Sequence, residues 1–230
     1  DIYMNYIEFI INNQNYFEDF ITRSTYHSNA IEGSTLSVQE TYALLFNNNH
    51  CRIENASPRE IYEAINHKKA LLFLLEKSQN KEKLSHDFLI RVNQIINENI
   101  IYVGGYRLGS IRIIGSQKKF PYPLELERQM DQFILEYNQL MYKEITMEDI
   151  ASMHNRYENI HPFPDGNGRT GRLLINYLLL VKNQCPIVIP MGKRKEYLQY
   201  MEDNNIVALA NLFINLQKEE QDRMNDFSQM

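Results

Sequence analysis

The stretch HPFPDGNGRTGR, from His161 to Arg172, decides how this chain is interpreted. It holds one imidazole, one carboxylate, three glycines and two guanidiniums, and an apolar run follows it directly. Its GNGRTG portion has the spacing of a dinucleotide-binding fingerprint, which requires a preceding strand inside a βαβ unit. Here a helical pattern precedes the stretch, two prolines join them, and no parallel-strand pattern surrounds it. We therefore reject a dinucleotide-binding fold.

The stretch is better explained as a loop that feeds the N-terminus of a helix. Gly166 and Gly168 allow positive φ, so that successive backbone N–H groups point into one concavity. The helix that follows adds its free amides and the positive end of its dipole. Arg169 and Arg172, three apart on the first turn, reach one region and suit forked contacts to phosphate. With Asn167 as a further amide donor, the loop is expected to bind two or three phosphates.

Two titratable side chains in the same stretch add chemistry to this anion site. A polyphosphate is usually bound with Mg²⁺, which takes one or two carboxylates with phosphate oxygens and water, so Asp165 is the candidate ligand. His161 can accept a proton near neutral pH and is the candidate general base. A zinc site built from His154, His161 and Asp165 would lack a fourth ligand and helical spacing. Singly, each residue has an ordinary structural explanation, but together they favour group transfer onto a hydroxyl.

Composition limits the other possibilities. The chain has 230 residues, 43% of them hydrophobic and 23% charged, which is typical of a globular protein. A net charge of -5 argues against a nucleic-acid-binding surface. Cys51 and Cys185 are too few for a disulfide framework; we expect both to be small buried side chains and the protein to be cytoplasmic. The apolar run LLINYLLLVKN is too short to span a membrane and predicts a buried core helix.

Helical periodicity dominates the rest of the chain. Apolar residues between 2 and 22 recur at three- and four-residue intervals. Ser37 with Glu40, and Ser57 with Glu60, have the spacing of capping boxes that begin helices. Further helices are expected over about 85–98, about 124–142, from 146, after the loop, and from about 206. We predict an all-α fold, with an N-terminal helical segment, residues 1–84, packed on a core formed by residues 85–230.

One segment differs in amino-acid composition from the helical segments around it. VGGYRLGSIRIIGSQKKFPYP, residues 103–123, carries four glycines and two prolines around a short β-branched run. Such a composition predicts a β-hairpin rather than a helix.

The quoted stretch resembles the Fic family, whose signature H-x-F-x-[DE]-G-N-G-R-x-x-R it matches at every fixed position. The resemblance covers about residues 85–215. It implies a Fic-type helical bundle with a short β-hairpin flap, and an enzyme that transfers AMP from ATP to a hydroxyl of a target protein. It also implies that the flap, near residues 106–120, docks the target by strand addition.

The resemblance also implies a role for individual residues. His161 matches the general base, and Asp165 the ligand of a Mg²⁺ ion bridging the α- and β-phosphates. Arg169 and Arg172 match the clamps on the β- and γ-phosphates. The remaining matches are the anion nest (Gly166, Asn167, Gly168) and the adenine pocket (Tyr197, Asn204).

A second element, upstream, fits an inhibitory motif of the same family. Ser28-x-x-x-Glu32-Gly33 follows the pattern [ST]-x-x-x-E-[GN], in an N-terminal position that makes the chain class II-like. A glutamate delivered to Arg172 would form a bidentate pair in the place of the ATP γ-phosphate. The alternative is a helix that simply ends at Gly33, with Ser28 and Glu32 as a solvated pair.

Several functional readings stay open at this stage. Relatives of this fold also remove AMP from modified targets or transfer UMP, phosphocholine or phosphate. A non-catalytic nucleotide sensor is a further alternative, although a sensor has no need of His161 as a base. The sequence leaves open the target protein, self-modification, homo-oligomer formation, and whether inhibition acts within one chain or between chains.

Overall fold

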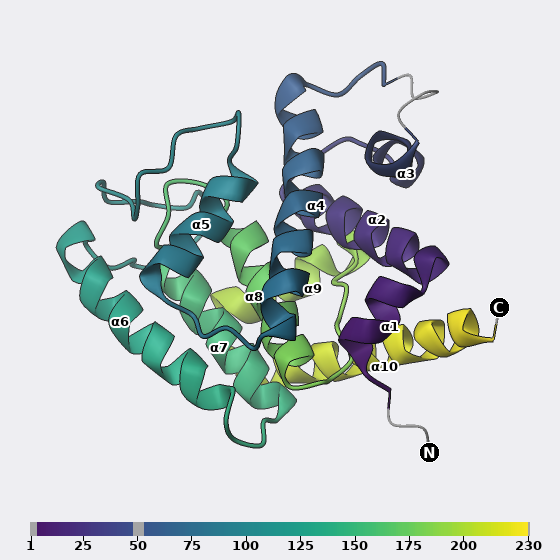
Figure 1. Cartoon of the computed structure of the whole chain (residues 1–230). Helices are drawn as coiled ribbons and strands as arrows, with labels where there is room; N and C mark the ends of the chain where they lie inside the picture. The colour runs from purple at the N-terminus through teal and green to yellow at the C-terminus, as the bar shows by residue number, and fades with distance from the viewer. Residues whose placement is uncertain (1–3, 48–52, 230) are drawn as a thin grey trace.

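The computed structural model describes residues 4–47 and 53–229, and within them every regular element is a helix. Cys51, predicted to be buried, lies outside these ranges. Figure 1 shows the helices gathered around α8. In chain order they are α1 (Tyr6–Asn12), α2 (Gln14–Ile31), α3 (Val38–Phe46), α4 (Pro58–Gln79), α5 (His86–Ile96), α6 (Pro123–Leu140), α7 (Met147–Ile160), α8 (Asn167–Val181), the 3₁₀ turn η1 (Met191–Lys193), α9 (Arg194–Glu202) and α10 (Ile206–Ser228).

The predicted helix starts are confirmed by their capping contacts. The Ser37 hydroxyl accepts a hydrogen bond from the backbone N–H of Glu40, and the Ser37 N–H donates to the Glu40 carboxylate. Ser57 and Glu60 form the same box at the start of α4. The single helix expected over 2–22 is instead two, because Asn13 has extended backbone angles and caps α2 with its side chain. An Asn side chain that bonds the backbone locally competes with helix continuation at that point.

Helix α8 is the centre of the molecule and positions the candidate loop. Every residue from Arg169 to Val181 is buried, as predicted for the apolar run within it. It packs against α2, α4, α5 and α7. Since α7 leads into the loop and α8 leads out of it, both ends of the loop are fixed by the core. Cys185, just beyond α8, is buried as predicted.

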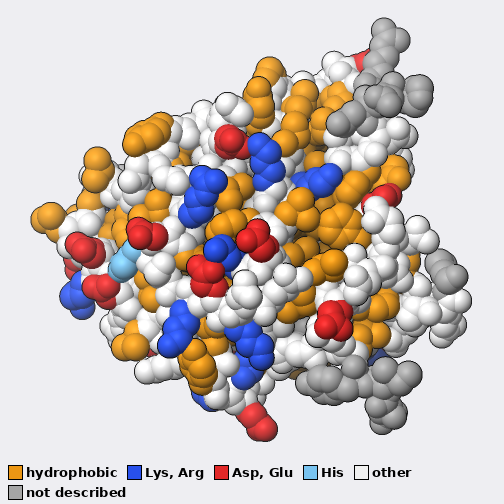
Figure 2. Space-filling model, viewed as in Figure 1, with side chains coloured by type: hydrophobic (Ala, Val, Ile, Leu, Met, Phe, Trp, Pro, Cys, Tyr) orange, Lys and Arg blue, Asp and Glu red, His pale blue; other side chains and the backbone are white. Residues whose placement is uncertain are grey.

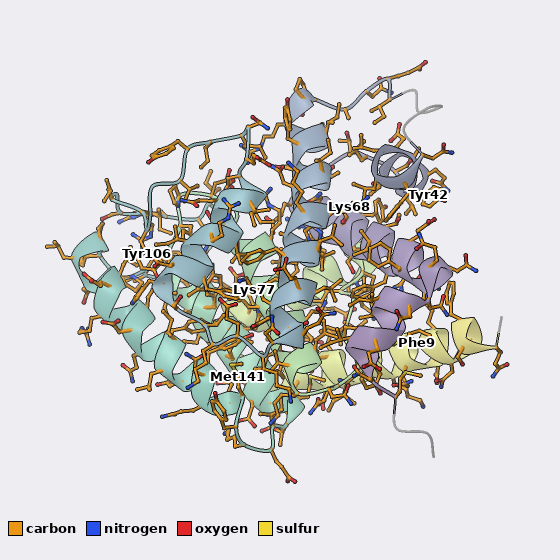
Figure 3. The ribbon with its side chains drawn as sticks, viewed as in Figure 1. Phe9, Tyr42, Lys68, Lys77, Tyr106 and Met141 are labelled. Atoms are coloured by element: carbon orange, nitrogen blue, oxygen red, sulfur yellow. The ribbon has the colours of Figure 1, made fainter. Side chains whose placement is uncertain are left out.

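Helix α2, which carries the proposed inhibitory motif, is held against α10 by a buried ion pair. In Figure 1 it runs from α4 towards the lower right, where α10 lies below its N-terminal end. The guanidinium of Arg23 makes two hydrogen bonds to Glu220, at 2.9 and 2.6 Å, and Tyr16 donates to the same carboxylate. On the other side, Lys68 of α4, labelled in Figure 3, caps α3 by donating to Leu45 O. The ion pair thus ties α2 to α10, and the Lys68 contact ties α3 to α4.

The hairpin predicted over 103–123 is not present: residues 101–122 form an irregular loop, the teal trace at the upper left of Figure 1. One tight turn occurs, closed by Ser116 N donating to Ile113 O, with Gly115 at φ 85°. The β-branched run has no strand beside it in the described ranges. Without a ladder partner, the backbone is held by side chains instead.

Arg107 is the main anchor of this loop. It is 3% exposed, and its guanidinium donates only to backbone carbonyls, which tie the loop to itself and to the end of α7. These acceptors are the carbonyl oxygens of Gly109, Pro121, Ile160 and His161.

None of the helices in the described ranges is long and apolar enough to cross a membrane.

Candidate active site

The loop between α7 and α8 begins and ends with left-handed residues. His161 is the C-cap of α7 at φ 50°, and its N–H donates to Tyr157 O at 3.0 Å. Gly166, the N-cap of α8, has φ 76°. Between them, the Asn167 side chain bonds Phe163 twice, accepting from its N–H and donating to its carbonyl. Asn167 therefore closes the loop on itself, which corrects our expectation that its amide faces a phosphate.

Helix α5 supports this loop from behind. Asn93 and Asn97 each donate to the backbone carbonyl of Asp165, at 2.9 and 3.2 Å. A Cβ on Gly166 would lie 2.9 Å from Ile96, so only glycine fits against α5. Sequence reasoning missed both asparagines. Their signal was two amides, four residues apart, on the buried face of an amphipathic helix.

His161 is a partly buried, neutral base at the edge of the site. Its side chain is 22% exposed, and its ring packs against Phe120 with centroids 5.3 Å apart. Burial lowers the pKa of His161 to about 4; the Glu158 backbone carbonyl opposes this, and Arg107 adds to it. The imidazole is consequently unprotonated at neutral pH and able to accept a proton.

Arg172, on the second turn of α8, is bound by the end of α2. Its Nε donates to Ser28 Oγ at 2.9 Å, and its Nη2 to Ser28 O at 3.0 Å and to Glu32 Oε1 at 2.6 Å. The predicted contact between Glu32 and Arg172 is present, but through one carboxylate oxygen, so the expected bidentate geometry is wrong. Ser28 is buried, not solvated, and accepts hydrogen bonds from Nε and Nη2 of the guanidinium.

The Glu32 carboxylate occupies the N-terminus of α8. An ideal Cβ on Gly168 would lie 2.3 Å from Glu32 Oε1, so the two are in direct contact. Burial raises the pKa of Glu32, but the charges of Arg172, Arg169 and Arg194 outweigh it, and the net pKa is lowered. Glu32 is therefore an anion at the place where the free amides and dipole of α8 favour one.

Gly33 ends α2 directly after this glutamate. It has φ 100°, and Ser34 N and Gly33 N donate back to Asn29 O and Ala30 O, each at 3.0 Å. These are the two bonds of a Schellman motif. The motif makes Glu32 the last residue before the chain turns away, with its side chain directed at α8.

A cavity of about 450 Å³ lies in front of the loop. It is more polar than the sequence suggested, because α4 contributes three charged side chains. Sequence reasoning placed Glu60 only in a capping box and missed Arg59 and Glu63, which belong to no motif. The lining residues include Glu32, Arg59, Glu60, Glu63, His161, Asp165, Gly166, Asn167, Gly168 and Arg169.

Asp165 and Arg169 both line this cavity and contact each other, and α4 contributes Arg59 to the same cluster. Arg59 Nη2 lies 2.5 Å from Asp165 Oδ2, and Arg169 Nη2 lies 3.3 Å from Asp165 Oδ1. Arg169 is 3% exposed and 3.6 Å from Glu63, and its Nε and Nη1 atoms have no hydrogen-bond partner. Two buried, unpartnered guanidinium nitrogens beside a cavity indicate a site for an anion.

The donor set limits which metal ion could bind. The described residues contain no group of three His, Cys, Asp or Glu side chains that could hold an ion. His154, weighed as a zinc ligand, is buried with Nε2 bonded to the Tyr197 hydroxyl at 2.5 Å. Asp165 alone fits Mg²⁺ that completes its shell with phosphate oxygens and water.

Tyr197 and Asn204 do not line this cavity. Tyr197 is 1% exposed and stacks on His154. Asn204 Oδ1 accepts hydrogen bonds from Asn155 and Asn159, both at 2.9 Å, and from Lys118 of the loop at 3.4 Å. Their assignment to an adenine pocket stays a prediction.

Comparison with known proteins agrees with the motif. The model of the Fic/DOC family matches residues 83–179. The protein adenylyltransferase Fic of Nematostella vectensis is 32% identical over 190 residues, which cover 78% of this chain and 42% of that protein. The chain belongs to the Fic/DOC family. Protein adenylyltransferase fic-1 of Caenorhabditis elegans is 31% identical over 177 residues, 75% of this chain and 34% of its own length. The chain thus spans less than half the length of these curated relatives.

Solved structures of Fic proteins share the fold. A Fic-domain-containing signalling protein from Bacteroides thetaiotaomicron superposes with a TM-score of 0.84 at 25% identity, over 96% of this chain and 95% of that one. Fic-1 from Caenorhabditis elegans superposes with a TM-score of 0.75 at 25% identity, over 94% of this chain and 64% of that one. The match to the first structure includes α2, so the N-terminal helices are part of a fold seen elsewhere.

Proposed function

We propose that this chain is a protein adenylyltransferase, which transfers AMP from ATP to a protein hydroxyl and is held inactive by Glu32. The observation that carries the proposal is the ion pair of Glu32 with Arg172, at the N-terminus of α8 and beside the cavity that His161 and Asp165 line. The curated relatives are named protein adenylyltransferases, which supports AMP as the transferred group.

Each residue of the loop has a separate role in the proposed reaction. The substrate hydroxyl oxygen attacks the α-phosphorus, the bond from that phosphorus to the β-phosphate oxygen breaks, and pyrophosphate leaves. His161, neutral at pH 7, takes the hydroxyl proton. The amides at Gly166–Gly168 and the Arg169 guanidinium, whose Nε and Nη1 atoms have no hydrogen-bond partner, bind the phosphates. Mg²⁺, held by Asp165, would supply further charge neutralisation. Positioning and electrostatics carry most of such a reaction.

Inhibition follows from competition for one guanidinium. In the absence of Glu32, Arg172 would be free to bind the γ-phosphate. With Glu32 in place, a carboxylate already occupies that position against Gly168. A nucleotide could then bind only with its triphosphate displaced, so that the α-phosphorus is not in line with the attacking oxygen.

We further propose that the target docks on the loop at residues 106–120. Leu108 and Ile114 of this loop are fully exposed, at 95% and 103%. In Figure 2, hydrophobic side chains protrude along the upper-left margin of the face, the region that this loop occupies in Figure 1. Because the loop has no strand partner of its own, an extended target segment could pair with its backbone.

The test is a labelling experiment with ATP carrying label at either the α- or the γ-phosphate. The Glu32→Gly variant, incubated with Mg²⁺ and each ATP, should become labelled from the α-position only, with an added mass of one AMP. Label from the γ-position would indicate phosphate transfer and overturn the proposal. Nucleotide binding with no label on any protein, in the presence of a cell lysate as target source, would indicate a sensor instead.

Removal of AMP is the second candidate, because Glu32 and His161 line the same cavity. In that reaction Glu32 would orient a water molecule for attack on the AMP group. Self-labelled Glu32→Gly protein, freed of ATP and mixed with unlabelled wild-type chain, should release AMP if this activity exists. Stable label would reject it without affecting the transferase proposal.

A further inference from the structure

Two partly buried side chains, each with one buried polar atom that lacks a hydrogen-bond partner, lie close together at the C-terminal end of α7. Glu158 and His161 are three residues apart, so their side chains lie on one face of the helix end. Glu158 Oε2 lies 3.8 Å from His161 Nδ1, and their side chains are 12% and 22% exposed. Glu158 Oε1 and His161 Nδ1 have no hydrogen-bond partner. Leaving such groups unpaired is unfavourable, so their proximity calls for an explanation.

The surroundings of Glu158 are built to accommodate a carboxylate. An ideal Cβ on Gly171 would lie 2.4 Å from Glu158 Oε1, so α8 has room for this side chain only because a glycine stands there. Burial raises the pKa of Glu158 to about 7; Arg172 of α8 and Lys118 of the loop oppose this, whereas Glu32 of α2 adds to it.

We propose that Glu158 is a positioning residue for His161: its carboxylate accepts the Nδ1 hydrogen and leaves Nε2 unprotonated for the substrate hydroxyl. An acceptor at one ring nitrogen fixes the tautomer and the orientation of the imidazole, and it stabilises the imidazolium that forms. At 3.8 Å the two atoms are beyond hydrogen-bond distance, so the bond requires them to approach each other. Such bonds are often long before substrate binds.

The competing explanation is that the backbone alone orients the ring. The Glu158 backbone carbonyl also acts on His161, raising its pKa against the effect of burial. In that case the carboxylate would be dispensable. The other charged groups around the ring, Arg107 from the loop, Asp165 from the motif and Glu32 from α2, do not explain the tautomer, because no bond joins any of their side chains to Nδ1.

The decisive experiment is ¹⁵N NMR of histidine side chains in the whole chain, which needs no turnover. The His161 signals are assigned by their loss in His161→Ala. In the wild type and in Glu158→Gln, which keeps an acceptor oxygen, we expect protonated Nδ1 and unprotonated Nε2. In Glu158→Met, which removes the acceptor, we expect a mixture of tautomers. An unchanged tautomer in Glu158→Met, or an Nε2–H tautomer in the wild type, would overturn the proposal.

A kinetic comparison links this bond to the proposed function, on which its catalytic meaning rests. In a Glu32→Gly background, Glu158→Met should lower kcat roughly 10- to 100-fold, as loss of supporting contacts does, with little change in KM for ATP. Glu158→Gln should recover part of the rate, and Glu148→Met, at an exposed position of α7, should have no effect. If the His161 tautomer differs between the wild type and Glu158→Met but no variant transfers AMP, the positioning role is supported and the proposed transferase activity is rejected. Equal kcat values in all variants would overturn the positioning role alone.

Discussion

Glu32 Oε1 lies 2.6 Å from Nη2 of Arg172, although 140 positions of the chain separate the two residues. The two partners differ in solvent exposure: the Arg172 side chain is 8% exposed, whereas that of Glu32 is 42% exposed. Ser28 holds the guanidinium through two further hydrogen bonds, one from Nε and one from the same Nη2 atom. The arginine is therefore fixed, and the carboxylate, at the end of α2, is the group that can leave when a phosphate takes its place.

Replacement of His161 tests the base. We expect His161→Ala, in the Glu32→Gly background, to lower AMP transfer by about 10²- to 10⁴-fold, the usual contribution of a general base. ATP binding should persist, because the phosphates are bound by α8 and its arginines. The measurements are initial rates of label incorporation and ATP titration by calorimetry. Undiminished transfer would contradict the assignment of His161.

Replacement of Arg169 tests the phosphate site. Its Nε and Nη1 are buried and unpartnered, so a bound phosphate should gain charge-assisted hydrogen bonds from them. Such bonds contribute about 1.5–3 kcal/mol, which corresponds to roughly 10- to 100-fold in the Kd for ATP. We expect Arg169→Met to lose that affinity in the Glu32→Gly background. The exposed Arg128→Met serves as the charge-matched control, and equal affinities for the two variants would argue against the site.

The stability of the segment after Glu32 should depend on pH through Glu60. Its carboxylate accepts from Ser57 N at 2.7 Å and from Thr35 N at 2.6 Å, and these bonds lower its pKa to about 2. A depressed pKa means that the stabilisation is full above the ordinary value near 4.5 and is lost as the pH falls towards 2. Glu60→Gln should cost about 1 kcal/mol at pH 7, as other helix-cap losses do.

Urea unfolding of the wild type and Glu60→Gln at several pH values measures this dependence. The difference in free energy of unfolding should shrink between pH 4.5 and pH 3. A difference that stays constant over that interval would show that the carboxylate charge contributes nothing.

Asn204 should control the order of the loop that we propose as the docking surface. Its side-chain oxygen accepts a hydrogen bond from Lys118, and the same lysine donates to the side chain of Asn159. We expect Asn204→Ala to increase proteolytic cleavage within residues 106–120. Asn99→Ala is a matched control, because Asn99 is also an asparagine with positive φ, at 62° against 51°. Equal cleavage rates in both variants would contradict the anchoring role.

The helical architecture was largely predictable from local chemistry. The boxes at Ser37 and Ser57, and the buried run after Arg172, depend on short-range spacing that one sequence displays. The hairpin prediction failed because a strand needs a partner, and the partner is a long-range property. At residues 101–122, hydrogen bonds from the Arg107 side chain to backbone carbonyls hold the segment, in place of hydrogen bonds to a neighbouring strand.

The residues of the candidate site that lie in the loop were predictable from the sequence. Those that other helices contribute were not. His161, Asp165 and Arg169 line one cavity as expected. Arg59 of α4 and Asn93 of α5 reach the loop from distant positions and have no motif. The Asn167 amide was assigned to phosphate because it lies in the motif, whereas its geometry serves the loop itself.

The rate of AMP incorporation in Glu32→Gly, relative to the wild type, tests inhibition by Glu32 most directly. The control is Glu98→Gly, which removes a glutamate that is paired with Lys69, away from the cavity. Since the lost ion pair is charge-assisted, we expect Glu32→Gly to be at least about 10-fold faster than the wild type, and Glu98→Gly to match the wild type. Equal rates in all three proteins would contradict the claim that Glu32 and the nucleotide compete for Arg172.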